Sequence, residues 1–388
     1  MLEDLHERGL ITNDNGANCI FVPKRKVPLM VQKSDGGYGY DTTDLAALRY
    51  RVNVENAEWI IYVTDEGQKL HFDTVIDAGK QVGYMDPAKT RYDHVGFGLV
   101  LQVMADGAEE TKEAPKDAAA KKGGKKAPQP KDGAAVETAK VEEPKKEAVA
   151  EEPKKVVEES KKGEEAKKPK IGKMKTREGD STKLMDLIDE AKNRTLDIFR
   201  QRMKDDDDET STQADRKVQV DEAHLEQTAE IMGVSAIKYY DLKQSRIQNY
   251  VFAFDKMLDP RGNTGVYLLY MYVRVLSIMR KGSYEGEALA ALLADPTVTF
   301  TISNKSEREL ALALLRLPEQ IDLAMTDLQL NRLTDQLYEI AVKIGEFYQQ
   351  SKVLGAPEEK SRILLLEATR RVMHLLFTLL GMKTIDRI

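Results

Sequence analysis

Residues 29–48 read LMVQKSDGGYGYDTTDLAAL and carry the clearest fold signal in the chain. A short β-prone run ends at the Gly36-Gly37 turn, and the residues that follow are typical of the start of a helix. Tyr40 and Asp44 stand four residues apart at that start, so both side chains can project to one side of the helix. A strand, a turn and a helix in this order predict part of an α/β layered domain.

The alternation of strands and helices continues after this stretch. Residues 59–63, WIIYV, suit a buried strand, residues 95–103 predict a second one, and a helix is expected between them over about 68–83. Strands that alternate with helices are typical of a mainly parallel sheet. The first residues differ: Leu2, Leu5 and Leu10, with Gly9 as a stop, resemble the end of a helix, and we expect the chain to begin inside a domain.

The composition excludes several classes of protein. A formal charge of −6 over 388 residues argues against a generally basic nucleic-acid-binding protein, so any RNA contact must come from local patches. A single cysteine, Cys19, excludes an internal disulfide and a four-cysteine zinc site. The first twenty residues lack the apolar core of a signal peptide, and no apolar run reaches the roughly 18 residues that a membrane-spanning helix needs. We expect a cytoplasmic protein with no membrane partner.

Residues 104–171 differ sharply from the rest in composition. They are dominated by Lys, Glu, Ala, Pro and Gly, and from 105 to 170 they contain no aromatic residue and no Leu, Ile or Met. Such a segment cannot bury enough apolar surface to offset its chain entropy, and we predict a disordered insertion. Two interpretations stay open: a tolerated surface insertion, or an electrostatic tether for RNA phosphates.

The remaining chain is predicted to be overwhelmingly helical. Ser181 or Thr182 is expected to cap a helix. Its core face would include Leu184, Leu187, Ile188, Ala191 and Ile198. The acidic run 205–209 is interpreted as a solvated loop that interrupts the helices, because a metal site would need converging ligands from elsewhere. Apolar stripes over 310–317, 328–347 and 363–380 predict a bundle, with Pro318 breaking the first and Gly381 stopping the last.

Tyr40 and Asp44 are the first candidates for a binding site. A carboxylate at this position can pair with a cationic substrate, and a carboxylate matches the geometry of a guanidinium especially well. The alternative is structural, with Asp44 capping the helix and Tyr40 in the core.

The motifs around these residues resemble those of arginyl-tRNA synthetases of the eukaryotic cytosolic type. KSDGG at 33–37 and YDTTD at 40–44 resemble one family motif, and TDEGQ at 64–68 followed by His71-Phe72 resembles the next. The resemblance implies that Tyr40, Asp44 and Gln68 hold the substrate arginine. Gln68 follows a predicted strand, at the carboxyl end of a parallel sheet where ligands bind, although it also suits an ordinary helix start.

The resemblance extends to ATP. His94-Val95-Gly96-Phe97-Gly98 is similar to the strand and loop against which adenine lies, although a glycine pair in a strand also marks a bulge. KMKTREGD at 173–180 resembles the mobile nucleotide loop, in which Lys173, Lys175 and Arg177 would neutralise the pyrophosphate leaving group. Which of the two lysines faces phosphate is left open. ATP is therefore the expected co-substrate, with Mg2+, and no protein metal site is expected.

Residues from 241 onward resemble the family's entry into its anticodon-binding bundle. Tyr267, Tyr270, Tyr272 and Arg274 suit stacking on, and hydrogen bonding to, unpaired anticodon bases, and Met382 is a candidate from the terminal tail. Tyrosines at helical spacing are also common in protein cores, so a structural role stays open.

The resemblance predicts an α/β part followed by an all-α part. The catalytic class I Rossmann-like domain would provide its carboxy-terminal half at 1–103, before the insertion at 104–171. A nucleotide loop with a helical region would follow at 172–240 and the anticodon-binding bundle at 241–388.

None of the five histidines forms the His-x-Gly-His signature of class I enzymes, so the chain is expected to be the later portion of such an enzyme. Two functions are open. One is a monomeric arginine-tRNA ligase acting on L-arginine, ATP and tRNA(Arg). The other is a non-catalytic tRNA-binding fragment or remnant.

Overall fold

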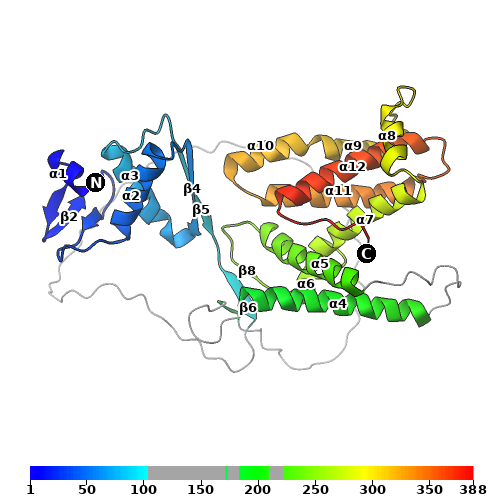
Figure 1. The fold of residues 1–388 in the computed structure, drawn as a ribbon, viewed down its shortest axis with the longest axis horizontal. Helices are drawn as coiled ribbons and strands as arrows, with labels where there is room; N and C mark the ends of the chain where they lie inside the picture. The colour runs from blue at the N-terminus through cyan, green and yellow to red at the C-terminus, as the bar shows by residue number, and fades with distance from the viewer. Residues whose placement is uncertain (104–170, 174–182, 209–221, 388) are drawn as a thin grey trace, which may run out of the picture. The chain divides into compact units, whose positions relative to one another are not determined.

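The computed structural model describes residues 1–103, 171–173, 183–208 and 222–387, and residues 1–103 form the predicted α/β part (Figure 1). Its elements in chain order are α1 (Leu2–Glu7), β1 (Thr12–Asp14), β2 (Ala17–Ile20), β3 (Leu29–Gln32), α2 (Tyr40–Asn53), β4 (Trp59–Asp65), the 3-10 turn η1 (Glu66–Gln68), α3 (Lys69–Gln81), β5 (Arg91–Phe97) and β6 (Val100–Val103). The predicted helix stop at Gly9 is confirmed by its φ of +64°.

The sheet arrangement is less parallel than the sequence predicts. β1, β2 and β3 form an antiparallel sheet, whereas β4 and β5 pair in parallel, from Trp59 opposite Arg91 to Asp65 opposite Phe97. The tight turn between β1 and β2 is made by Asn15 and Gly16, both at positive φ. An Asn-Gly pair is the strongest local signal for such a hairpin. The sequence therefore contains a signal for the antiparallel pairing of β1 and β2.

The core of the α/β part lies where α2 and α3 pack together. Leu45 and Leu48 of α2 are fully buried with Val75 and Ile76 of α3. A Cβ at Gly79 would lie 2.3 Å from Leu48 Cδ2, so glycine at this position permits the close approach of the two helices. This packing holds the first turns of α2 and α3 near each other, which positions the candidate site.

The β4–β5 sheet is covered on one face. Ile60 and Tyr62 are buried in the same cluster as α3, whereas Ile61 and Val63, which alternate with them, are 41% and 63% exposed. Parallel sheets are normally covered on both faces. Within the described residues, this face of the strand therefore leaves branched apolar side chains accessible.

The single strand predicted over 95–103 is wrong. β5 ends at Phe97, and β6 begins at Val100 and joins a different sheet. In that sheet β6 pairs antiparallel with β7 (Ile171–Lys173) and parallel with β8 (Tyr250–Val251). Gly98 separates the strands because its amide donates to Arg246 O, at 2.8 Å, instead of continuing the β4–β5 ladder.

The helical part is confirmed, with one change at its start. It contains α4 (Leu184–Asp208), α5 (Glu222–Leu242), α6 (Phe254–Met257), α7 (Gly265–Lys281), α8 (Gly286–Ala294), α9 (Lys305–Leu315), α10 (Leu317–Asp327), α11 (Asn331–Gln350) and α12 (Glu359–Leu379). α4 continues to Asp208, so the loop predicted from Asp205 is wrong up to that residue. Neither Gly nor Pro occurs in that helix to end it earlier.

The core face of α4 agrees with the predicted one in part. Ala191 is buried and Ile198 packs against the same cluster, as predicted. Leu196 and Phe199 are also buried, whereas Leu184 is 67% exposed. The expected caps Ser181 and Thr182 and the whole insertion up to residue 170 lie outside the described residues. Ile171, the last residue assigned to the insertion, begins β7.

The bundle is closed by α7, α9, α11 and α12, whose buried residues form one large cluster (Figure 1). Pro318 ends one helix as predicted but also begins α10, since proline is favoured in a first helical turn. Gly381, at φ +65°, stops the last helix as predicted. Among the described helices, none combines the length and apolar composition needed to cross a membrane.

Candidate functional site

The turn before α2 presents Tyr40 and Asp44 as the sequence predicts. Gly36 has a φ of +79°, and Asp35 accepts the Gly37 amide at 2.8 Å, which fixes the turn. The N-cap of α2 is Gly39, so Asp44 does not cap the helix. Tyr40 is 86% exposed, so it is not a core residue either. Both structural alternatives are therefore wrong.

Asp44 forms one side of a three-residue cluster with His71 and Asp41. His71 Nε2 lies 2.7 Å from Asp44 Oδ2, and His71 Nδ1 lies 3.3 Å from Asp41 Oδ1. The other oxygen of Asp41 accepts the Met30 amide at 3.0 Å. Within the described residues, Asp44 Oδ1 has no hydrogen-bond partner, so one oxygen of a half-buried carboxylate is available.

Gln68 lies at the junction of η1 and α3, immediately after β4. It is exposed, and its side chain makes no capping hydrogen bond. The turn before it is fixed by Asp65, which accepts the Gly67 amide at 2.8 Å. Gln68 stands three residues before His71 at the start of the same helix, a spacing that puts both side chains on one side.

The predicted adenine strand is β5, and its glycines have a structural role. A Cβ at Gly96 would lie 1.7 Å from Glu66 Oε2, and one at Gly98 would lie 2.6 Å from the Gln248 backbone. The backbone of Gln248 therefore requires glycine at position 98, just after β5, independently of any nucleotide, whereas a side chain at position 96 would displace the Glu66 carboxylate. Val95 is buried, whereas Phe97 is 42% exposed.

His94 is the polar side chain within the predicted adenine stretch of residues 94–98. Its Nε2 is 2.8 Å from Thr64 Oγ1, while Nδ1 is buried without a hydrogen-bond partner. Burial, with the nearby charge of Lys69, lowers the pKa of His94. The lowered pKa favours a neutral ring at this position, in the middle of β5 opposite Tyr62.

Arg246 is a residue of this region to which no role was assigned from the sequence. Its Nη1 donates to Gly96 O at 2.6 Å, and its Nε is buried without a partner. Burial lowers the pKa of this guanidinium, with Glu66 acting in the opposite direction. Arg246 belongs to the stretch from residue 241 that resembles the entry into the anticodon-binding bundle. Its position against β5 depends on tertiary contact.

The nucleotide loop is described only at its first residue. Lys173 ends β7 and pairs with Leu101 of β6. Lys175 and Arg177 lie outside the described residues.

The predicted anticodon residues separate into surface and core groups. Tyr270 is 44% exposed on α7, and Arg274 lies half-buried one turn further along the same helix. Tyr267 is half-buried and packs edge-on against Tyr338. Tyr272 and Met382 are buried in the bundle core, at 3% and 5% exposure, so the predicted base contacts of their side chains are corrected to core packing.

Tyr348 of α11 completes the surface group and was missed. It is exposed, and the Arg274 guanidinium carbon lies 4.0 Å from its ring centre. The same carbon lies 5.8 Å from the centre of the Tyr270 ring. The Arg274–Tyr270–Tyr348 cluster joins two helices, so no spacing within one helix reveals it.

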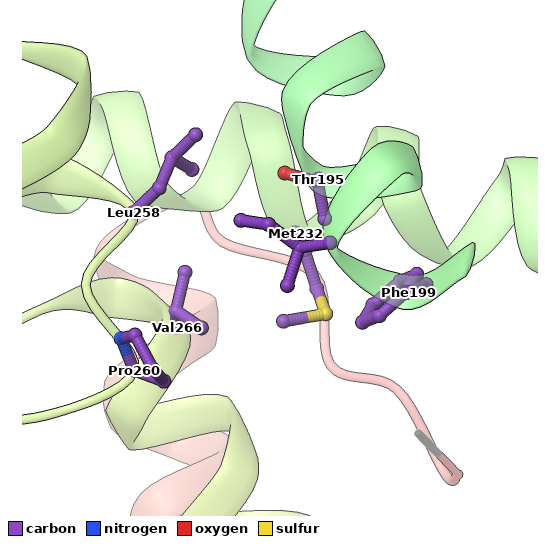
Figure 2. A pocket seen from close by; sticks show the side chains of 7 residues that line it. Thr195, Phe199, Met232, Leu258, Pro260 and Val266 are labelled. Carbon is purple, nitrogen blue, oxygen red and sulfur yellow. The ribbon is translucent and has the colours of Figure 1, made fainter. Parts of the chain in front are cut away.

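Two hollows lie away from these residues. A cavity of about 20 Å³ between α4, α5 and the start of α7 is lined almost entirely by apolar side chains, as Figure 2 shows. It has no convergent polar groups, so it is a packing gap and not a ligand site. An open groove of about 590 Å³ is lined by residues that include Gln32, Tyr38 and Thr43, but by none of the three predicted arginine contacts.

Comparison with known proteins gives the same assignment for both parts of the chain. The profile of "tRNA synthetases class I (R), catalytic domain" matches residues 1–113 and 162–254, and that of the "DALR anticodon binding domain" matches 268–388.

Among the described residues, no group of three or more His, Cys, Asp or Glu side chains has an arrangement that could hold a metal ion.

Curated relatives cover the whole chain. It is 36% identical to the chloroplastic/mitochondrial arginine–tRNA ligase of Arabidopsis thaliana, over 100% of this chain and 48% of that protein. It is 32% identical to the cytoplasmic enzyme of Bos taurus, over 100% of this chain and 48% of that one. The chain thus spans about half the length of the curated relatives it matches.

Solved structures agree with this fold. Arginyl-tRNA synthetase from Plasmodium falciparum superposes with a TM-score of 0.69 at 29% identity, covering 100% of this chain and 51% of that one. The Thermus thermophilus arginyl-tRNA synthetase, at 16% identity and a TM-score of 0.66 over 100% of this chain and 57% of that one, supports the fold alone. The chain therefore belongs to the arginyl-tRNA synthetase family, with a class I catalytic domain followed by an anticodon-binding domain of the DALR type.

Proposed function

We propose that this chain supplies the arginine-selecting and anticodon-binding parts of an arginine-tRNA ligase. The observation that carries the proposal is the half-buried Asp44 carboxylate, whose Oδ1 has no hydrogen-bond partner among the described residues, one helical turn from the exposed Tyr40. A carboxylate with an available oxygen is suited to a guanidinium, because the charged hydrogen bonds it accepts are among the strongest in proteins. Gln68, on the neighbouring helix start, would add an amide to the same substrate.

The proposed reaction is the one that the family assignment implies. An oxygen of the arginine carboxylate attacks the α-phosphorus of ATP, pyrophosphate leaves, and arginyl-adenylate forms. A terminal ribose hydroxyl of tRNA(Arg) then attacks the activated carbonyl, and AMP leaves. Asp44, Tyr40 and Gln68 bind and orient the amino acid in both steps.

The ATP assignment rests on β5 and the nucleotide loop. Residues His94 to Gly98 are proposed to lie beside adenine, and Phe97 is the exposed apolar side chain there. Lys173, Lys175 and Arg177 are proposed to neutralise the leaving pyrophosphate. Mg2+ is proposed to accompany the ATP phosphates.

The anticodon assignment is carried by the Arg274–Tyr270–Tyr348 cluster and by Tyr267 beside it. Exposed tyrosine rings offer stacking surfaces to unpaired bases, and the guanidinium adds a cation for base edges or phosphate. We propose tRNA(Arg) as the RNA, a monomer as the acting form and the cytoplasm as the compartment. Cytoplasmic enzymes of Arabidopsis thaliana and Bos taurus are among the relatives and support a eukaryotic cytosolic type.

The proposal is tested by titrating the chain with L-arginine in a calorimeter, and by arginine-dependent exchange of pyrophosphate into ATP. We expect arginine binding that Asp44→Ala weakens by about 100-fold, the loss typical of a charged hydrogen-bonding partner. L-Citrulline, the uncharged isostere, should bind weakly to both forms. Equal binding of arginine by Asp44→Ala and the unmodified chain would reject the pocket.

Exchange separates the two functions. Exchange that requires arginine and is lost in Asp44→Ala supports the ligase. A chain that binds tRNA(Arg) but neither binds arginine nor supports exchange would instead be a tRNA-binding fragment.

A further inference from the structure

His71 is placed between two carboxylates in a way that the proposed function does not use. Its two ring nitrogens face Asp44 Oδ2 at 2.7 Å and Asp41 Oδ1 at 3.3 Å. The ring is partly enclosed: its side-chain exposure is 29%, as is that of Asp44. A histidine whose nitrogens both meet acceptors is fixed in orientation from two sides.

The Asp41 side of this arrangement is anchored to the backbone. Asp41 Oδ2 accepts the Met30 amide, so this carboxylate cannot rotate without breaking a second hydrogen bond. Phe72 meets the His71 ring edge-on, with centroids 5.0 Å apart, and itself stacks on Tyr62 at 4.4 Å. Asp41, His71 and Asp44 therefore form a series of contacts that runs from the β3 backbone to the carboxylate of the candidate site.

The acidic side chains at this position match the expected ligand. Asp41 and Asp44 place two carboxylates on one turn of α2, and such a pair attracts a cationic guanidinium. Without the ring, two carboxylates on one turn of α2 would repel each other and Asp44 would lose its orientation.

We propose that His71 is a positioning residue for arginine: it holds Asp44 Oδ2 through Nε2 and leaves Oδ1 directed to the guanidinium. The inference rests on the proposed arginine site and adds a residue that does not itself touch the substrate. Residues that orient a ligating carboxylate or imidazole in this way are commonly worth about 10-fold to 100-fold in affinity.

The test uses the full chain and calorimetric titration with L-arginine. His71→Gln places an amide nitrogen near the position of Nε2 and keeps the donor to Asp44, whereas His71→Asn places one near Nδ1, on the Asp41 side, and removes the donor to Asp44. His71→Gln is expected to bind arginine within about threefold of the unmodified chain, because the hydrogen bond to Oδ2 survives. His71→Asn is expected to lose about 10-fold to 100-fold.

Matched controls separate positioning from folding. His224→Leu changes an exposed histidine of α5 and should leave arginine affinity unchanged. Thermal unfolding of His71→Gln and His71→Asn should give similar midpoints, since the hydrogen bond that distinguishes them is partly exposed and adds little to stability. Affinity for L-citrulline should respond little in either variant, because it has no charge for Asp44 to meet.

The outcomes distinguish this inference from the function on which it rests. If Asp44→Ala weakens arginine binding but His71→Gln and His71→Asn both bind like the unmodified chain, or both lose affinity equally, the positioning role is overturned and the arginine site stands. If the unmodified chain does not bind arginine, or Asp44→Ala binds it unchanged, the arginine site and the inference both fall.

Discussion

Two carboxylates, one in each part of the chain, differ in how completely their oxygens are paired. In the bundle, Glu307 Oε1 accepts from Arg362 Nε at 2.7 Å and Oε2 accepts the Ser303 amide at 2.5 Å, with both side chains almost inaccessible. In the α/β part, Asp44 shares only Oδ2 with His71, and both side chains are 29% exposed. The first arrangement is closed, whereas the second leaves an oxygen for a ligand.

The difference teaches how to separate structural from functional charge in this molecule. Arg362 also donates to Lys352 O at 2.7 Å, so the closed pair ties α9 and α12 to the segment between α11 and α12. A buried charge is tolerable only when its partners are complete, which explains the closure. The Asp44–His71 pair is tolerated with an unpaired oxygen because water reaches it, and the same access admits a substrate.

The largest expected effect breaks the closed pair. Glu307→Ala should lower the free energy of unfolding by about 3–5 kcal/mol, because it leaves Arg362 buried and unpaired. Chemical denaturation followed by helical circular dichroism measures it. Asp44→Ala is the matched variant of the open pair and should cost less than about 1 kcal/mol.

A double variant sharpens this prediction. Glu307→Met combined with Arg362→Met should recover much of the loss, since no charge remains buried. A double variant as unstable as Glu307→Ala would contradict the desolvation argument. Equal losses from Glu307→Ala and Asp44→Ala would remove the distinction between the two pairs.

A smaller effect is expected on RNA affinity, from the surface of the bundle where the Arg274 guanidinium lies over the Tyr348 ring. Tyr348→Ala should weaken binding of the tRNA(Arg) anticodon stem-loop by about 1–3 kcal/mol, the value of one base stacked on an aromatic ring. Fluorescence anisotropy with a labelled stem-loop measures it. Tyr272→Phe, a change in the core, should leave RNA affinity unaltered; a similar loss in both would argue against a surface role for Tyr348.

The smallest effect is a dependence of stability on pH from a second closed carboxylate, Glu367. Burial acts to raise its pKa, but hydrogen bonds from Arg370 and Arg371 prevail and lower it. Its contribution to stability is therefore present above the unfolded-state value of about 4.3 and is lost as pH falls through the lower folded-state pKa. Denaturation midpoints below pH 4.5 should decline less steeply in Glu367→Gln than in the unmodified chain. Parallel curves would contradict the assignment.

Much of the candidate site was predictable because its residues lie within short motifs. The turn at Gly36 and the four-residue spacing of Tyr40 and Asp44 are local features, and the structure presents both side chains at the start of α2. The N-cap of α9 was also readable, since Asn304 accepts the Glu307 amide at 3.0 Å from a three-residue spacing. His71 lies in one of the family-like motifs, but its contacts with Asp41 and Asp44 could not be predicted because those residues belong to another helix.

By itself the sequence determined the α/β part and the helical bundle, because periodicity and turn chemistry act over a few residues. The residues proposed to bind arginine came from motifs that resemble those of the family. Only the tertiary structure decided what those residues meet. It split residues 95–103 into two strands through the contact of Gly98 with Arg246, buried Tyr272 and Met382, and joined Arg274 to Tyr348 across two helices. It also set His71 between Asp41 and Asp44, since contacts between elements depend on how helices pack and not on spacing along the chain.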